Sequence, residues 1–366
     1  MSTTQLERIE TPAAIVDVER MRANIARAAR YCLEHGLDWR PHVKTHKVPA
    51  LATEQLRAGA VGVTVATMRE AEEMATVCDD ILLAYPPIGE AKLDRLMSLP
   101  DGVRLTVALD STEALTGLAA AALAAGREVG VLVECDFGMH RVGVPSAEDA
   151  AALATEAAAL DGVDYRGILF YPGHVRRHAS EQAPALRELA STLEGFLHAL
   201  EAVGCTPAVV SGGSTPTLWR SHEIPGLTEI RPGTNIFNDR TTAVIGVSSW
   251  DEIAYSILAT VVSTRVPGQA VIDAGAKSLA KEELRGEGAG FGALLSDPGV
   301  VVRAVSEEHG ILDLSSTDWR PRVGDQVRVV PNHVCLSVHL QERLLGVRGD
   351  EVEAEWVVSA RDRGPR

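Results

Sequence analysis

Short apolar runs alternate with longer amphipathic stretches over the first two thirds of the chain. Several of the runs are apolar with little hydrophobic–polar alternation, as expected for parallel strands that are covered on both faces. The runs predicted as strands are 39–44, 61–66, 80–85, 104–110, 129–135, 165–171, 208–211 and 227–231. The stretches predicted as helices are 48–58, 68–77, 89–98, 111–125, 146–160, 181–203 and a short one near 215–222.

This alternation predicts a (β/α)8 TIM barrel, because eight strand–helix units over such a length are typical of that fold. An open doubly wound sheet is the alternative. The first strand is not followed by a Gly-x-Gly-x-x-Gly turn, which favours the barrel. We therefore predict a barrel domain over residues 12–245.

The pattern changes beyond residue 245, where strand-like runs follow one another without a long helix between them. These runs are 255–264, 270–273, 300–304, 326–330, 343–347 and 351–357. They predict a second, antiparallel β domain over residues 246–366. A further strand at 11–18 precedes an amphipathic helix at 19–35, and this strand is a candidate to pair with the β domain.

Composition narrows the possible functions of the 366-residue chain. Its 46% apolar and 23% charged residues are ordinary for a soluble globular protein. The net charge of −15 argues against nucleic-acid or anionic-membrane partners, since both require basic surface. We see no signal-peptide core and no apolar run long enough for a membrane span. The five cysteines form no CxxC motif and are odd in number, which favours a reducing, cytoplasmic location.

Candidate chemistry starts at Lys44, which we expect at the carboxyl end of the first barrel strand, where barrel enzymes carry their sites. A lysine amine acts as a nucleophile and forms Schiff bases when burial or nearby cations hold part of it neutral. The basic neighbours in this segment are Arg40, His42, His46 and Lys47. Taken alone, the segment is better interpreted as a basic surface loop, and the later motifs reverse that preference.

Two glycine-rich loops follow the seventh and eighth predicted strands, at 211–217 and 231–235. Glycine lets backbone N–H groups approach an anion, and hydroxyl groups add further donors. Each loop alone is more often a turn, but loops at these two positions commonly hold a phosphate. Together with an amine on strand one they suggest pyridoxal phosphate bound to Lys44 as a Schiff base. The residues predicted to bind the cofactor in these loops are Gly213, Ser214, Thr215, Gly233, Thr234 and Asn235.

Three further candidates follow the fifth and sixth predicted strands. Arg141 could complement the charge of the cofactor's phenolate oxygen, although a surface arginine that caps a loop is equally consistent with its position. Tyr171 is a predicted cofactor contact. His174 could move protons or hold substrate beside the cofactor, whereas a loop histidine is usually polar surface.

The β domain contributes Pro331-Asn332-His333-Val334-Cys335. In an extended segment, residues two apart point to one face, so His333 and Cys335 could bind the same metal. Imidazole and thiolate together suit zinc. From two residues alone, a buried structural cysteine beside a turn histidine is the better interpretation, since catalytic zinc usually has three protein ligands.

Taken together, the chain resembles the D-serine dehydratase and D-threonine aldolase family of fold-type III pyridoxal-phosphate enzymes, which is related to alanine racemase. The segments that carry the resemblance, in order from about residue 10 to 360, are 41–47, 137–144, 171–174, 211–216, 231–234, 273–278 and 331–335. It implies a barrel plus a β domain, Lys44 as the Schiff-base lysine, Arg141 near the phenolate, a divalent metal at His333 and Cys335, and a homodimer. A His-x-Cys motif resembles the dehydratases, whereas the aldolases have His-x-Asp, and this favours zinc and dehydration.

The resulting hypothesis is a lyase for small D-amino acids with a β-hydroxyl. Freed Lys44 would remove the Cα proton while zinc polarises the hydroxyl, giving a keto acid and ammonia. In the closest alternative, His174 takes the hydroxyl proton and the Cα–Cβ bond breaks, giving glycine and an aldehyde. A metal-independent racemase and a non-catalytic cofactor carrier are the remaining alternatives.

Overall fold

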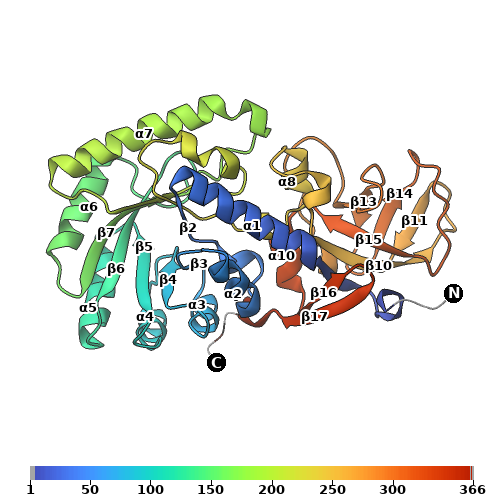
Figure 1. Ribbon diagram of the computed structural model, residues 1–366, viewed down its shortest axis with the longest axis horizontal. Coiled ribbons are helices and arrows are strands. Elements are labelled where there is room, and N and C mark those ends of the chain that lie inside the picture. The colour runs from blue at the N-terminus through green and yellow to red at the C-terminus, as the bar shows by residue number, and fades with distance from the viewer. Residues whose placement is uncertain (1–4, 363, 365–366) are drawn as a thin grey trace. The chain divides into compact units, whose positions relative to one another are not determined.

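The computed structural model describes residues 5–362 and 364, and the chain divides into two compact units (Figure 1). The barrel unit comprises Arg27–Val175, Ala179–Gly233 and the described residues from Ala360 onward. The β unit comprises the described residues up to Ala26, Arg176–His178 and Thr234–Ser359. Among the described residues, no helix is long and apolar enough to cross a membrane.

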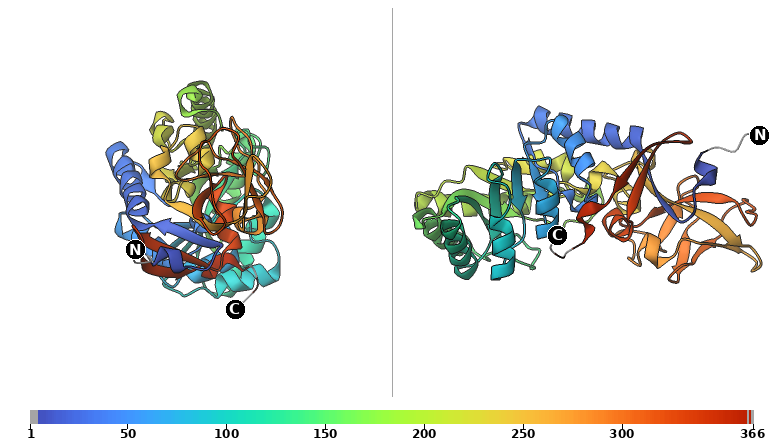
Figure 2. Two further views of the ribbon diagram at one scale, coloured as in Figure 1. Left: turned by 90° about the vertical axis from the view of Figure 1, so that its right-hand side faces the viewer. Right: turned by 90° about the horizontal axis from the view of Figure 1, so that it is seen from below.

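The barrel unit contains a curled sheet of eight parallel strands with helices around it (Figure 1, Figure 2). The strands are β2 (Asp38–Trp39), β3 (Val63–Val65), β4 (Asp80–Leu83), β5 (Arg104–Leu109), β6 (Val129–Cys135), β7 (Val163–Phe170), β8 (Val209–Gly212) and β9 (Glu229–Ile230). The helical elements are the latter part of α1 (Val18–His35), η2 (Val43–Thr45), α2 (Pro49–Arg57), α3 (Met68–Met74), α4 (Glu90–Met97), α5 (Thr112–Ala124), α6 (Ala147–Ala159), η3 (Ala179–Glu181), α7 (Ala183–Ala202) and η4 (Leu218–Glu223).

The sheet closes on itself, because its terminal strands β2 and β3 meet. The N–H of Val61 donates to the carbonyl of Trp39 at 2.9 Å, and His42 forms a parallel bridge with Thr64. The interior is apolar where Leu82, Ala108, Leu132 and Leu169 from four neighbouring strands pack together. The predicted barrel is therefore confirmed, and each of its eight strands overlaps the run predicted for it.

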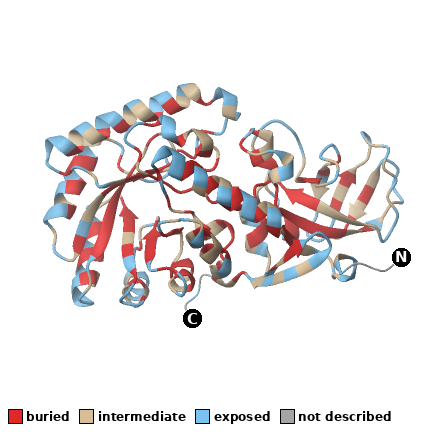
Figure 3. Cartoon of the chain, viewed as in Figure 1, coloured by how far each residue is buried: buried red, intermediate tan, exposed pale blue. Residues whose placement is uncertain are grey.

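Local sequence signals determine where three of the barrel helices begin. Thr67, Ser111 and Ser146 each accept a backbone N–H at the start of α3, α5 and α6, as N-cap residues do. All seven residues of β6 are buried, in agreement with its unbroken apolar run (Figure 3). The short helix predicted near 215–222 is the 3-10 helix η4.

The first barrel strand is shorter than predicted. β2 ends at Trp39, and the predicted strand residues 43 and 44 lie in the 3-10 turn η2. Pairing continues irregularly as far as His42, whose N–H donates to the carbonyl of Pro232 at 3.1 Å. The Val43 carbonyl then accepts from the N–H groups of both His46 and Lys47, and these bonds replace strand pairing with a turn. Lys44 therefore lies on a turn beyond the strand rather than at its end.

The β unit is built on a nine-stranded sheet in the described chain. Its strands are β1 (Ala13–Asp17), β10 (Tyr255–Ser263), β11 (Gln269–Ile272), β12 (Gly292–Leu294), β13 (Val302–Val305), β14 (Gly310–Asp313), β15 (Gln326–Pro331), β16 (Arg343–Arg348) and β17 (Glu351–Val357). Its other helical elements are η1 (Leu6–Arg8), η5 (Thr234–Ile236), α8 (Arg240–Val244), η6 (Trp250–Glu252), α9 (Ala276–Leu279), α10 (Val334–Leu340) and η7 (Ser359–Arg361).

The N-terminal strand belongs to this sheet, as the sequence suggested. β1 pairs antiparallel with β10 and parallel with β16. Ile15, Leu258 and Val347 form the apolar cluster at that junction. The prediction did not include β12, β14 or the short helices, and it treated the segment of His333 and Cys335 as extended. In the structure His333 is the N-cap of α10, and Cys335 lies in the first turn of that helix.

Candidate active site

The turn η2 that carries Lys44 is fixed by its basic neighbours. Lys47 forms a buried ion pair with Glu70 of α3, whose other oxygen accepts the N–H of Ala66 at 2.7 Å. His46 is fully buried and its Nε2 hydrogen-bonds to Gln55 at 3.1 Å. Lys47 and His46 thus hold the segment that follows Lys44 through buried contacts with α3 and α2.

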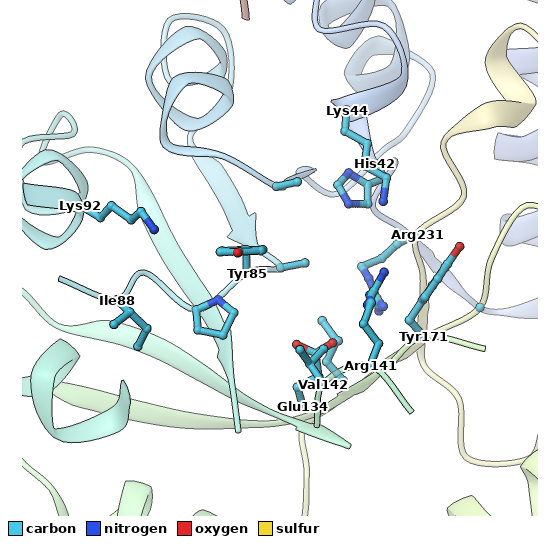
Figure 4. Close-up of a pocket in the computed structure, with 15 residues that line it drawn as sticks. His42, Lys44, Tyr85, Ile88, Lys92, Glu134, Arg141, Val142, Tyr171 and Arg231 are labelled. Carbon is cyan, nitrogen blue, oxygen red and sulfur yellow. The ribbon is translucent and has the colours of Figure 1, made fainter. Parts of the chain in front are cut away.

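Lys44 lines a cavity of about 550 Å³ in the barrel unit (Figure 4). The walls consist of residues at the carboxyl ends of several barrel strands and in the segments that follow them. They are His42, Lys44, Ala66, Ala84, Tyr85, Pro86, Ile88, Lys92, Glu134, Arg141, Val142, Leu169, Tyr171, Gly213 and Arg231. Of the predicted site residues in the barrel unit, the structure brings Lys44, Arg141, Tyr171 and Gly213 to this cavity.

One wall is organised by the ring of Tyr171. The Lys44 Nζ lies 5.8 Å from the ring centroid and the Arg141 guanidinium carbon lies 5.1 Å from it. A Cβ on Gly173 would lie 2.2 Å from the ring, so only glycine leaves room for Tyr171 in this position. The amine and the guanidinium therefore meet around one aromatic ring.

The two glycine-rich loops pack against each other and against η2. The N–H of Gly233 donates to the hydroxyl of Thr215 at 3.2 Å, and the N–H of Ser214 donates to the hydroxyl of Thr217 at 3.2 Å. A Cβ on Gly233 would lie 2.6 Å from the carbonyl oxygen of His42. Ser214, Thr215 and Gly233 thus lie behind the cavity lining, which Gly213 reaches with its left-handed backbone (φ +76°).

His42 lines the cavity and has one polar atom without a hydrogen bond. Its Nδ1 is buried and has no hydrogen-bond partner among the described residues. Burial, assisted by the charges of Lys44, Arg231 and Lys47, holds the pKa of His42 well below its usual value, so the ring is neutral. A neutral ring with one unused nitrogen, next to a lysine amine, fits an aromatic, hydrogen-bonding ligand such as pyridoxal phosphate.

Three charged residues on the cavity were not among the predicted site residues: Arg231, Glu134 and Lys92. Arg231 and Glu134 are buried, and Figure 4 shows their side chains on the side of the cavity that holds Arg141. Burial lowers the pKa of Arg231 to about 10, against the opposing effect of Glu229 and Glu134. Burial raises the pKa of Glu134, against Arg231 and Arg141. The signal for Glu134 in the sequence is an acid inside an otherwise apolar strand, β6.

His174 is exposed and does not line the cavity. Its ring packs over Gly138, where a Cβ would approach the imidazole to 3.3 Å. The structure therefore places His174 against the loop of Arg141 and not with Lys44.

In the β unit, His333 and Cys335 do come together. The two side chains interact through a hydrogen bond, and Cys335 Sγ also lies 3.6 Å from the hydroxyl of Thr234. Burial lowers the pKa of His333, but Cys335 and Asp239 outweigh it and raise that pKa to about 11. The residue that sequence reasoning missed is Asp239, which is fully buried and lies 3.3 Å from His333 Nδ1.

Asp239 is itself held on both oxygens. One accepts the N–H of Thr242 at 2.8 Å, and the other accepts the N–H of Val334 at 3.0 Å as well as facing His333. A carboxylate on one ring nitrogen leaves the other nitrogen for a metal, as is usual for ligating histidines. His333 and Cys335 therefore fit a metal as a pair, although no group of three or more His, Cys, Asp or Glu side chains in the described chain is arranged to hold one.

The predicted cofactor contact Asn235 also belongs to the β unit. Its side chain is buried, and neither amide atom is hydrogen-bonded to a described residue.

Each of the two units contains a region that matches a known family model. Residues 16–241 match the family model described as the alanine racemase N-terminal domain, and residues 254–347 match a putative serine dehydratase domain. The chain is 31% identical to a D-threonine aldolase of Arthrobacter sp, over 97% of this chain and 94% of that one. It is 33% identical to the D-threo-3-hydroxyaspartate dehydratase of Delftia sp. (strain HT23), over 90% and 92% of the two chains.

Solved structures agree with these matches. The crystal structure of D-threonine aldolase from Filomicrobium marinum superposes with a TM-score of 0.91 at 30% identity, covering 97% of this chain and 96% of the other. Similar structures also include two D-threo-3-hydroxyaspartate dehydratase variants, in which a histidine and a cysteine two positions apart are each replaced by alanine. The cysteine variant is described as metal-free. With its racemase-like barrel and its dehydratase-like β unit, the chain belongs to the D-threonine aldolase and D-serine dehydratase family, whose members use pyridoxal phosphate.

Proposed function

We propose that this protein is a lyase that dehydrates and deaminates D-amino acids bearing a β-hydroxyl, with pyridoxal phosphate and a divalent metal, preferably zinc. The observation that carries the choice of dehydration is the donor pair of His333 and Cys335. Its spacing equals that of the histidine and cysteine replaced in the dehydratase variants, one of which is described as metal-free.

The cofactor would be held in the barrel unit. Lys44 supplies the amine for covalent attachment, and Arg141 places a permanent cation on the same wall. The Tyr171 ring lies beside both groups, and the imidazole of His42 belongs to the cavity lining. When bound, pyridoxal phosphate supplies an electron sink for the carbon that carries the amino group.

Lys44 is then the group that takes the Cα proton, because its amine is the base that the cavity offers beside the cofactor. His174 is not used in this proposal, since it is exposed outside the cavity. His333 and Cys335 would hold the cation, and the chemistry that it would supply is Lewis-acid assistance to a leaving hydroxyl. In the net reaction the Cα–H and Cβ–O bonds break, a C=C bond forms, and water then releases ammonia and leaves a 2-keto acid.

Identification of the products tests this proposal. The purified holoenzyme would be incubated with D-serine, D-threonine and D-3-hydroxyaspartate, with and without a chelator. We expect a keto acid and ammonia in equal amounts, lost on chelation and restored by zinc. Glycine and an aldehyde as the products would mean that the protein catalyses aldol cleavage instead of dehydration. Aldol cleavage is the reaction for which the Arthrobacter relative is named. Activity that a chelator leaves unchanged would contradict the metal assignment.

A further inference from the structure

Six side chains form a continuous row of hydrogen bonds inside the barrel, which we name the charge ladder. Its members, in order, are Arg104, Asp80, Arg40, Glu229, Ser211 and Arg231. Five of the six are largely buried, and Arg104 is the exposed end, with a side-chain exposure of 63%. The other end, Arg231, lines the Lys44 cavity. The ladder therefore connects the outer rim of the barrel to its candidate site.

The first links are ion pairs of short, regular geometry. Asp80 accepts from Arg104 Nη2 at 2.7 Å and from Arg40 Nη1 at 2.6 Å. Arg40 Nε donates to Glu229 at 2.6 Å. Positive and negative groups alternate from Arg104 to Glu229, so each of these four charges has an opposite charge beside it, which offsets the cost of removing it from water.

Ser211 links Glu229 to Arg231, and it fixes which group donates in each of the two hydrogen bonds. Its hydroxyl has one hydrogen, which it donates to Glu229, so that its lone pairs are left for Arg231. Arg231 Nη1 donates to this oxygen at 2.5 Å, and Arg231 Nη2 donates to the carbonyl of Phe170 at 2.9 Å. Each of the two amino groups of the Arg231 guanidinium therefore has a fixed acceptor. In this orientation Arg231 lines the cavity.

We propose that Ser211 and Glu229 are positioning residues, which hold the Arg231 guanidinium in one orientation against the bound cofactor. This inference rests on the proposed binding of pyridoxal phosphate in the cavity. Without the Ser211 hydroxyl, Arg231 Nη1 loses its acceptor and Glu229 loses a donor. The guanidinium then has another rotamer available, and the cofactor meets a cation that is no longer preorganised.

The test measures cofactor binding rather than turnover. Apo-protein would be titrated with pyridoxal phosphate, and the dissociation constant and the pH dependence of the cofactor's visible absorbance would be recorded. We expect Ser211→Ala to weaken binding by about tenfold, as for the loss of one hydrogen bond to a charged group, and to shift the absorbance titration. Ser211→Thr, which keeps the hydroxyl, should recover most of the affinity.

Two variants separate positioning from a general structural effect. Ser256 is a matched control in the β unit, since its buried hydroxyl also accepts from an arginine, Arg328 Nε, at 2.8 Å. Ser256→Ala should leave the dissociation constant and the spectrum unchanged. Arg104→Met, at the exposed end of the ladder, should likewise leave them unchanged.

Each outcome has one meaning. Wild-type protein that binds no pyridoxal phosphate would refute the proposed function itself. Wild-type binding with an unchanged Ser211→Ala variant, or with equal losses in Ser211→Ala and Ser256→Ala, would overturn the positioning role. If Ser211→Ala does not fold, Glu229→Gln decides instead, because it removes the charge of the hydroxyl's acceptor with little change in volume. Glu229→Gln must then show the same spectral shift, and an unchanged spectrum would overturn the inference.

Discussion

Glu70 of α3 pairs with Lys47 inside the barrel unit, and Lys47 lies three residues beyond Lys44 and two beyond the end of the turn η2. The Glu70 side chain is fully buried and that of Lys47 is 10% exposed. The position of the candidate Schiff-base lysine therefore depends on a charge pair that is shielded from water.

Glu70→Ala should destabilise the fold by about 3–5 kcal/mol, because it leaves the Lys47 ammonium buried without a partner and the N–H of Ala66 without an acceptor. Urea unfolding followed by circular dichroism measures the loss. Glu113→Ala, at an exposed position in the first turn of α5, should stay within about 0.5 kcal/mol of wild type. A loss below about 1 kcal/mol for Glu70→Ala would contradict the interpretation of the pair as a buried anchor.

Periodicity predicted the barrel well, since each of its strands is a local apolar run whose burial needs no knowledge of distant residues. The turn at Lys44 was not predicted, because it arises from two hydrogen bonds to the Val43 carbonyl within a segment of strand-like composition. β12 was also not predicted, because its strand structure depends on a partner that is distant in the sequence. Gly292-Ala293-Leu294 has weak strand propensity, and it is a strand because it pairs with β15.

The candidate site was predictable where a residue acts on its own and unpredictable where it acts through a distant partner. Lys44, Arg141 and Tyr171 were recognised from motifs, and each lines the cavity. Asp239 precedes His333 by almost one hundred residues and was recognisable only from the fold. His174 was selected for its chemistry, but its exposed position against Gly138 is a consequence of loop geometry.

Lys44→Ala should abolish the visible absorbance of the bound cofactor, because that band requires covalent attachment to the amine. Absorbance spectra of protein that has been saturated with pyridoxal phosphate and then freed of the unbound cofactor measure the effect. Lys92 lines the same cavity on the side of Tyr85 and Ile88, as Figure 4 shows. Lys92→Ala is therefore the matched control, and it should keep the band. Retention of the band in Lys44→Ala, or its loss in Lys92→Ala, would mean that the wrong lysine has been assigned.

Cys335→Ala should lose bound metal and elimination activity together while the cofactor band remains, since the proposal makes the thiolate a metal ligand and Lys44 belongs to the other unit. Metal content by elemental analysis, together with the absorbance spectrum, distinguishes the two losses. Cys205→Ala removes a buried thiol from the barrel unit and should change neither. Full activity and full metal content in Cys335→Ala would make the thiolate structural.

His46 should make stability depend on pH in a defined window. Burial, assisted by Lys47 and opposed by hydrogen bonds to Gln55 and Val48, lowers the pKa of His46 from 6.5 to about 4. Above pH 6.5 the ring is neutral in both the folded and unfolded states, and its contribution is fully present. As the pH falls toward 4 the unfolded chain binds the proton first, so up to roughly 3 kcal/mol of stability is lost across the window.

His46→Gln removes the titrating group while keeping a hydrogen-bonding side chain opposite Gln55. We therefore expect its free energy of unfolding to be lower than that of wild type at pH 7.5 but to fall less steeply between pH 6.5 and 4.5. Urea unfolding at several pH values measures both curves. The exposed His198→Gln should keep the wild-type slope. Parallel curves for His46→Gln and wild type would show that the ring is not held neutral by burial, and the rigid setting of the Lys44 turn would then need another cause.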